Sequence, residues 1–121
     1  MKKIVAGCFA VAVLAFAVNV LAASPTLKLG KTNFSKGEVV SVKFTAPKYA
    51  GNAWVGIIPS AIPHGNEATN DANDITYQYL NGRTKGTLTF SAPNKPGQWD
   101  LRMNNSDNNG VEVSSVTFTV K

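Results

Sequence analysis

The sequence predicts an all-β protein, an antiparallel two-sheet sandwich of immunoglobulin-like topology with about seven strands. Short segments in which apolar and polar residues alternate recur along the chain, and clusters of Gly, Pro, Asn and Asp separate them. After residue 22, no stretch has a helical period of useful length. Short strands at regular turn spacing are typical of such a sandwich.

The N-terminal segment has the three parts of a secretory signal peptide. Two lysines follow the first methionine, residues 4–18 form an apolar run, and small residues precede a cleavage site near Ala22. The run is shorter than the roughly 20 apolar residues of a spanning helix. The sequence therefore predicts a signal peptide over residues 1–22, a periplasmic or secreted location in a bacterium, and no membrane anchor after cleavage.

Cys8 is the one cysteine of the chain, and it lies inside this segment. Only one apolar residue separates the lysines from the lipobox-like residues 5–8, whereas an apolar signal region usually needs about seven or more. We therefore interpret Cys8 as an apolar residue of the signal. The domain that remains, residues 23–121, then has no disulfide and no cysteine–metal site.

Residues 23–121 carry ten basic and seven acidic side chains, a net charge of +3. The basic residues are scattered and form no run. Nucleic-acid binding needs a clustered basic face, so no nucleic acid is expected as a partner.

The first half of the domain predicts three strands. Residues 26–29 alternate, and residues 39–45 alternate more clearly, with three apolar side chains on one face. Residues 53–58 are apolar on both faces, which indicates a central strand. Gly56 within that strand indicates a bulge or the close approach of a neighbouring backbone. Phe34 is expected to pack on the core.

Residues 59–74 form the longest irregular segment, and a short helical turn is expected near residues 67–72. A loop of this length in a small domain is usually functional or mobile. Its oxygen-bearing side chains include Glu67, Asp71 and Asp74, which are ligands that calcium prefers. No cofactor is required by the sequence, and calcium at these three residues stays open as an alternative.

Two strands are predicted on either side of Asn81-Gly82, a dipeptide that favours a two-residue hairpin turn. The first covers residues 75–80. We expect its tyrosines, Tyr77 and Tyr79, to face inward; the alternative is that they form an aromatic stripe on the surface. Gly86 interrupts the return strand, and there we expect the chain to cross from one sheet to the other.

The last two strands are predicted over residues 98–104 and 111–120. In the first, alternation places Trp99 inward and Asp100 and Arg102 outward. In the second, the apolar phase changes, so a bulge is expected near Ser114-Ser115. Both tryptophans of the chain, Trp54 and Trp99, are predicted to be core residues.

Five motifs together resemble a known type of module. They are Phe-x-x-Gly-Glu (34–38), Trp-Val-Gly-Ile-Ile-Pro (54–59), Gly-Thr-Leu-Thr-Phe-x-Ala-Pro (86–93), Pro-Gly-x-Trp-x-Leu-Arg (96–102) and Val-Thr-Phe-Thr-Val (116–120). The set is similar to immunoglobulin-like β-sandwich modules of secreted bacterial proteins, which occur alone or beside hydrolases. The resemblance covers nearly all of residues 23–121. It implies the fold, and no activity or functional residue is carried over from it.

Catalytic chemistry is not predicted, so the protein is expected not to be an enzyme. The single histidine, His64, lies in the long loop between a proline and a glycine, and no serine sits in a nucleophile elbow. A histidine in a loop is usually solvated.

The loops fall at the two ends of the predicted sandwich. Strand counting puts residues 48–52, 81–85 and 104–110 at one end, where Tyr49, Asn52, Arg83 and Asp107 would form a binding surface. The acidic loop 59–74 is assigned to the other end, so Asp107 is not expected to join Asp71 or Asp74.

The sequence thus favours an exported, non-catalytic binding or interaction module that recognises a protein or an envelope glycan through its end loops. The alternative is an inhibitor of a secreted or periplasmic hydrolase, in which loop 59–74 protrudes with Ile62 at its tip.

Overall fold

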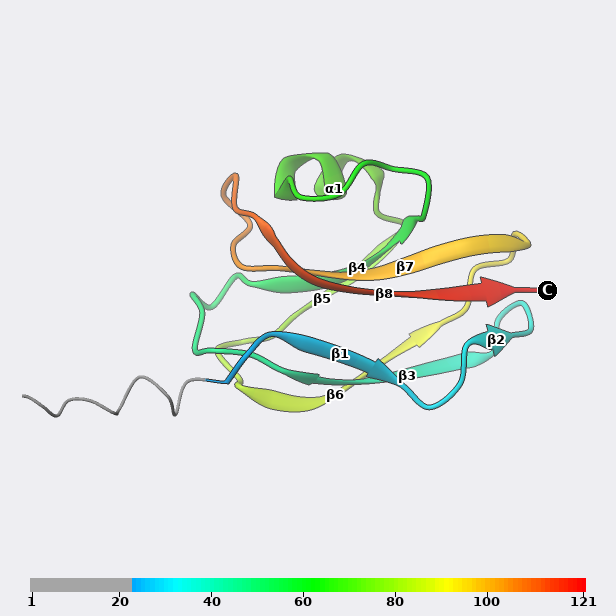
Figure 1. Cartoon of the computed structure of the whole chain (residues 1–121), viewed down its shortest axis with the longest axis horizontal. Coiled ribbons are helices and arrows are strands. Elements are labelled where there is room, and N and C mark those ends of the chain that lie inside the picture. Colours follow the sequence, from blue (N-terminus) through cyan, green and yellow to red (C-terminus); the bar gives the residue numbers. More distant parts are fainter. Residues whose placement is uncertain (1–22) are drawn as a thin grey trace, which may run out of the picture.

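A computed structural model describes residues 23–121. The predicted signal peptide lies outside the described residues. Two sheets pack face to face, as Figure 1 shows, with strand orders β1-β3-β6 (sheet A) and β2-β8-β7-β4-β5 (sheet B). The elements are β1 (Thr26–Leu29), β2 (Asn33–Phe34), β3 (Val39–Thr45), β4 (Trp54–Pro59), α1 (Glu67–Asn73), β5 (Thr76–Tyr79), β6 (Lys85–Ser91), β7 (Gly97–Asn104) and β8 (Glu112–Val120).

The predicted two-sheet sandwich is confirmed. Strands β8, β7 and β4 are antiparallel neighbours in one sheet, and β1, β3 and β6 are antiparallel neighbours in the other. This arrangement, with β1, β3 and β6 in one sheet and β4, β7 and β8 in the other, is that of an immunoglobulin-like sandwich. The eighth strand is the short β2, which pairs with β8 in parallel.

The apolar core lies between the sheets and follows from the period-2 patterns. Phe44 on β3, Val55 on β4 and Leu101 on β7 all point into it and are almost fully buried. Phe34 packs edge to face on Phe118, with ring centroids 5.6 Å apart. Trp99 belongs to the core as predicted.

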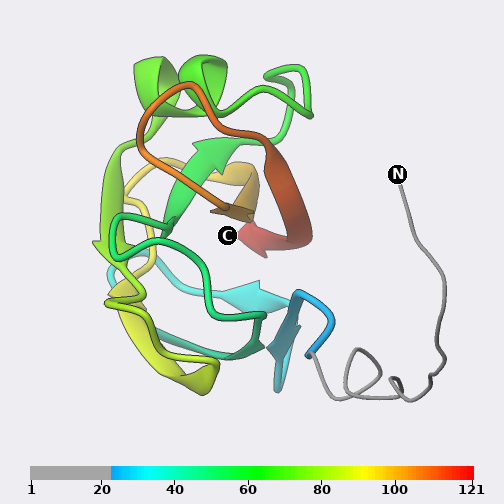
Figure 2. The same cartoon turned by 90° about the vertical axis from the view of Figure 1, so that its left-hand side faces the viewer.

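Trp54 is buried as well, but it lies on the opposite face of β4 from the core residues Val55 and Ile57. The predicted burial of Trp54 is therefore confirmed, but its side chain does not belong to the cluster between the two sheets. A third layer covers this outer face of sheet B, formed by α1 and the segment that precedes it (Figures 1 and 2). The strand is apolar on both faces because both are covered.

Helix α1 confirms the expected helical turn. Asn66 caps its N-terminus, since the Asn66 side chain accepts a hydrogen bond of 3.0 Å from the backbone N–H of Thr69. Gly56 shows the predicted close approach of a neighbouring backbone: a Cβ placed there would lie 3.1 Å from the Thr76 carbonyl oxygen, and also 2.5 Å from the Trp54 ring. The bulge in β8 falls at Val113, next to the predicted position.

The turn at Asn81-Gly82 has the expected positive φ angles, 57° and 76°, and Arg83 N–H donates to the Leu80 carbonyl. It does not join a hairpin, however, because β5 belongs to sheet B and β6 to sheet A. The crossing between sheets therefore occurs at this turn and not at Gly86. Gly86 lies within β6, opposite Phe44.

Within residues 23–121, the one helix is too short to cross a bilayer.

Candidate functional site

The outer face of sheet B carries a buried polar layer under residues 60–73. At its centre is Arg102, which is fully buried. Its Nε and Nη2 donate to Asp100 Oδ2 at 3.0 and 2.8 Å. Asp100 and Arg102 do point away from the core, as alternation predicts, but they are covered by protein and not by solvent.

Arg102 also holds the covering segment in place. Its Nη1 donates to the Pro63 carbonyl (3.1 Å) and to Asn70 Oδ1 (2.9 Å), and its Nη2 donates to the Ile62 carbonyl (2.7 Å). The loop before α1 and the helix itself are thus fixed to β7 by one guanidinium. Ile62 is half-buried, so the protruding tip that a hydrolase inhibitor would require is not formed at this residue.

Asp100 accepts further hydrogen bonds of 2.7 Å from the hydroxyls of Ser60 and Thr117. Burial acts to raise the pKa of Asp100, but these hydroxyls and the charged Arg102 outweigh it, and the pKa lies below its ordinary value of 3.8. The ionised carboxylate therefore stabilises the fold above pH 3.8, and this contribution is lost as the pH falls through the lowered pKa.

His64 lies at the rim of this layer, about half exposed. Its Nδ1 is 2.6 Å from Glu112 Oε2, and its Nε2 is 3.3 Å from Asp100 Oδ2. The sequence prediction of a merely solvated histidine misses these contacts. Because the Ser60 hydroxyl donates to Asp100, it is not paired with the imidazole as a nucleophile would be.

The path of residues 59–74 overturns the predicted division of the loops. The segment leaves the end of β4, runs back over sheet B, and reaches the 105–110 loop, where Glu67 N–H donates to the Gly110 carbonyl. Figure 2 shows this loop beside α1. Strand counting gives the end at which a loop starts, but a segment this long can traverse the whole sheet.

As a consequence, Asp107 meets the acidic residues of α1. Carboxylate oxygens of Glu67, Asp71 and Asp107 lie within 4.8 Å of one another. The expectation that Asp107 and Asp71 are separate is wrong. The sequence analysis grouped Glu67 and Asp71 with Asp74, whereas in the structure the third carboxylate of the group is that of Asp107. Asp74 is not one of the three convergent carboxylates. Its pKa is raised, mainly by burial and then by the charges of Asp71 and Asp107.

Glu67 is the buried member of this group. Its Oε2 accepts a hydrogen bond of 3.0 Å from Trp54 Nε1, and its Oε1 accepts one of 3.4 Å from Gly110 N–H. Three carboxylates at this distance are a donor set that suits a hard cation. The Glu67 oxygens already have donors within the protein, so the convergence has a structural explanation without a metal.

Next to these carboxylates, aromatic rings line a hollow of about 140 Å³. We call it the acidic aromatic hollow; its lining residues are Trp54, Asp71, Tyr77, Tyr79 and Asp107. The Tyr77 ring meets Trp54 and Tyr79 edge to face, with centroid distances of 6.1 and 5.3 Å. Tyr77 is 51% exposed, so the hollow opens to solvent.

The Tyr79 hydroxyl donates to Asp107 Oδ2 at 2.8 Å. This hydrogen bond to the negative carboxylate is the main reason why the pKa of Tyr79 is raised to about 12. The Tyr79 phenol is therefore neutral at neutral pH. The hollow combines aromatic rings with the carboxylate side chains of Asp71 and Asp107.

The four predicted ligand-binding residues have different surroundings. Of Tyr49, Asn52, Arg83 and Asp107, only Asp107 lines the acidic aromatic hollow. Tyr49 packs partly on the core, and burial raises its pKa. The Arg83 guanidinium lies over the Phe44 ring at 5.3 Å, and Asn52 Oδ1 is buried without a hydrogen-bond partner among the described residues.

The expectation that Tyr77 and Tyr79 face inward is wrong, and the alternative of an aromatic stripe on the surface fits their place in the hollow. Their alternation with Gln78 shows only that both lie on one face. The sequence of β4 indicates that the outer face of sheet B is covered, because a strand that is apolar on both faces needs a covering layer on each. Trp54 lies on the face of β4 opposite Val55, so it belongs to this outer face.

Comparison with known proteins adds no relative. No protein-family model matches the sequence, and no curated protein is similar to it.

Proposed function

We propose that the protein is an exported, non-catalytic binding module that recognises a protein or an envelope glycan. The ligand is held through a positively charged group, and the acidic aromatic hollow receives that group. The convergence of three aromatic rings with the carboxylates of Asp71 and Asp107 carries this proposal.

A cation over an aromatic face is attracted by the ring quadrupole, by about 0.5–1 kcal/mol at exposed sites and about 2 kcal/mol or more when desolvated. Nearby carboxylates add a Coulombic term that grows as water is excluded. An ammonium or guanidinium group, on a basic side chain or an amino sugar, satisfies both. A neutral sugar would use only the ring surfaces.

The hollow is built on a rigid support, which favours binding because little ordering is needed when the ligand arrives. Trp54 and Tyr79 lie on the paired strands β4 and β5. Asp71 is on α1, which Arg102 fixes to the sheet through Asn70. The same contacts hold loop 59–74 against sheet B, which does not favour an inhibitor that acts through a protruding loop.

The test uses pairs of probes that differ only in charge. Binding of glucosamine oligomers is compared with that of N-acetylglucosamine oligomers by calorimetry, and a lysine-rich peptide is compared with its acetylated form. The proposal predicts that the cationic member of at least one pair binds and that its neutral counterpart does not.

Variants test whether the cationic probe binds in the acidic aromatic hollow. Tyr77→Ala should weaken the cationic probe roughly 2- to 30-fold, which corresponds to the cation–π range of about 0.5–2 kcal/mol. Asp107→Asn should weaken it as well, whereas Glu38→Gln, which removes a carboxylate elsewhere, should not. Equal binding of charged and neutral probes, or equal losses in Asp107→Asn and Glu38→Gln, would contradict the proposal.

A further inference from the structure

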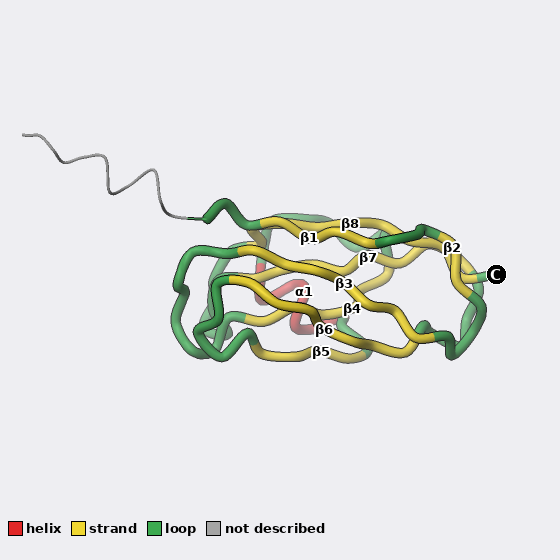
Figure 3. Tube along the Cα trace, turned by 90° about the horizontal axis from the view of Figure 1, so that it is seen from below, coloured by secondary structure: helices red, strands yellow, loops and turns green. Residues whose placement is uncertain are grey.

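The outer face of sheet A is the opposite side of the sandwich from α1, and Figure 3 views the molecule from this side. Three lysines project from it, one on each strand: Lys28 on β1, Lys43 on β3 and Lys85 on β6. All three are exposed, and none forms an ion pair with any described residue. This face is therefore a basic patch without internal neutralisation.

The strand register brings these charges together. Lys28 and Lys43 are direct cross-strand partners, and Lys85 is one diagonal step from Lys43, because Thr45 pairs with Lys85. Like charges directly opposite each other destabilise an antiparallel pair. A bound anion would remove that repulsion, so the pairing favours an anionic ligand.

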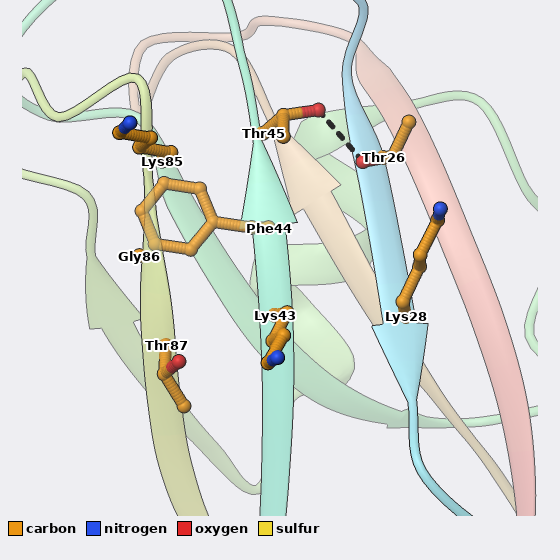
Figure 4. A pocket seen from close by; sticks show the side chains of 8 residues that line it. All are labelled: Thr26, Lys28, Lys43, Phe44, Thr45, Lys85, Gly86 and Thr87. Atoms are coloured by element: carbon orange, nitrogen blue, oxygen red, sulfur yellow. Dashed lines mark hydrogen bonds between the residues drawn. The ribbon is translucent and has the colours of Figure 1, made fainter.

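Between the lysines the surface is concave and carries hydroxyl groups. A hollow of about 680 Å³ lies over this face, and Figure 4 shows the side chains around it. Besides the lysines, it is lined by Thr26, Phe44, Thr45, Gly86 and Thr87. The hydroxyls of Thr26 and Thr45 are joined by a hydrogen bond of 2.7 Å, and Thr87 stands on the neighbouring strand.

We propose that this basic face, defined by Lys28, Lys43 and Lys85, binds an acidic polysaccharide. The ammonium groups span three adjacent strands, about 10 Å at the usual strand spacing, which suits a chain with repeated negative charges. Threonine hydroxyls donate to and accept from sugar hydroxyls. The site lies on the opposite side of the sandwich from the acidic aromatic hollow and takes a ligand of the opposite charge, so neither proposal depends on the other.

The chemistry of the face favours a glycan over an anionic bilayer. Membrane-surface binding needs apolar side chains that enter the lipid next to the basic ones. Here the residues beside the lysines are threonines, and the one aromatic ring, Phe44, is 2% exposed.

The experiment measures retention of the purified protein on polygalacturonate and on its uncharged methyl ester. The test variant carries Lys28→Gln, Lys43→Gln and Lys85→Gln. The matched control carries Lys36→Gln, Lys95→Gln and Lys121→Gln, three exposed lysines that do not line this hollow, so both variants lose the same charge. All six positions are exposed, and both variants should fold; circular dichroism checks this.

We expect the protein to bind the acid form only, with an affinity that falls as salt rises. The test variant should bind at least about tenfold more weakly, as expected when several charge contacts are lost, and the control should bind nearly as the wild type does. Three results would overturn the proposal: equal losses in the two variants, binding to anionic phospholipid vesicles in place of the polysaccharide, or self-association that the test variant alone abolishes.

Discussion

The planar guanidinium of Arg102 connects β7 to the segment that covers it. One buried side chain binds Asp100, Asn70 and three loop carbonyls, so its hydrogen-bond donors have partners although it is buried. The sequence predicts the direction of Arg102 through alternation. It does not predict burial, because an outward arginine on a strand normally faces water.

Replacement of this arginine should be strongly destabilising. Arg102→Met leaves Asp100 as a buried charge without its partner, and we expect the free energy of unfolding to fall by about 3–5 kcal/mol. Denaturant unfolding measures the change, with Arg83→Met as the control for losing an exposed arginine. Similar small losses in both variants would show that the buried network is not important for stability.

Tyr79 gives a prediction in the alkaline range. Its hydroxyl donates to Asp107, and its pKa is raised to about 12. Because the folded pKa exceeds the ordinary value of 10.0, this bond stabilises the fold fully below pH 10, and its contribution is lost as the pH rises through 12. NMR titration of the Tyr79 ring carbon should give this pKa, and Asp107→Asn should lower it. An unchanged value in Asp107→Asn would contradict the assigned cause.

The segment from Pro59 to β5 is the element that the sequence predicts least well. The sequence indicates its length, its acidic character and its helical turn, because these depend on local residues. Its path depends on contacts with β7 and β8 that are distant in sequence, such as Glu67 with Gly110. The turn at Asn81-Gly82 shows the same limit: its dihedral angles are local and are predicted, but the sheet that each neighbouring strand joins is not.

Helix α1 should depend on its cap. Asn66→Ala removes the acceptor for the Thr69 N–H, and we expect a loss of about 1 kcal/mol in the free energy of unfolding. Amide hydrogen exchange should show faster opening of α1 while the core strands stay protected. Asn66→Asp keeps an acceptor and serves as the control; if it opens α1 as much as Asn66→Ala does, the cap is not the cause.

At the scale of the whole molecule, charge is divided between the two sides of the sandwich. Six of the seven carboxylates are on the outer side of sheet B or in the segments next to it: Glu67, Asp71, Asp74, Asp100, Asp107 and Glu112. The lysine face of sheet A is on the other side. The sequence shows a modest net charge and charged residues that are scattered along the chain. Only the fold reveals that acidic and basic side chains are separated between the two sides. The two binding surfaces that we propose are therefore opposite in charge.

The central claim, that the acidic aromatic hollow binds a cationic group, is tested most directly through the two tryptophan indole N–H signals in a ¹⁵N NMR spectrum. Trp54 Nε1–H donates to Glu67 beside the hollow, whereas Trp99 Nε1–H donates to the Lys95 carbonyl and serves as an internal control. On titration with a glucosamine oligomer or a lysine-rich peptide, the account predicts a saturable shift of the Trp54 signal and none of the Trp99 signal. No shift of Trp54 with either probe, or equal shifts of both signals, would contradict it.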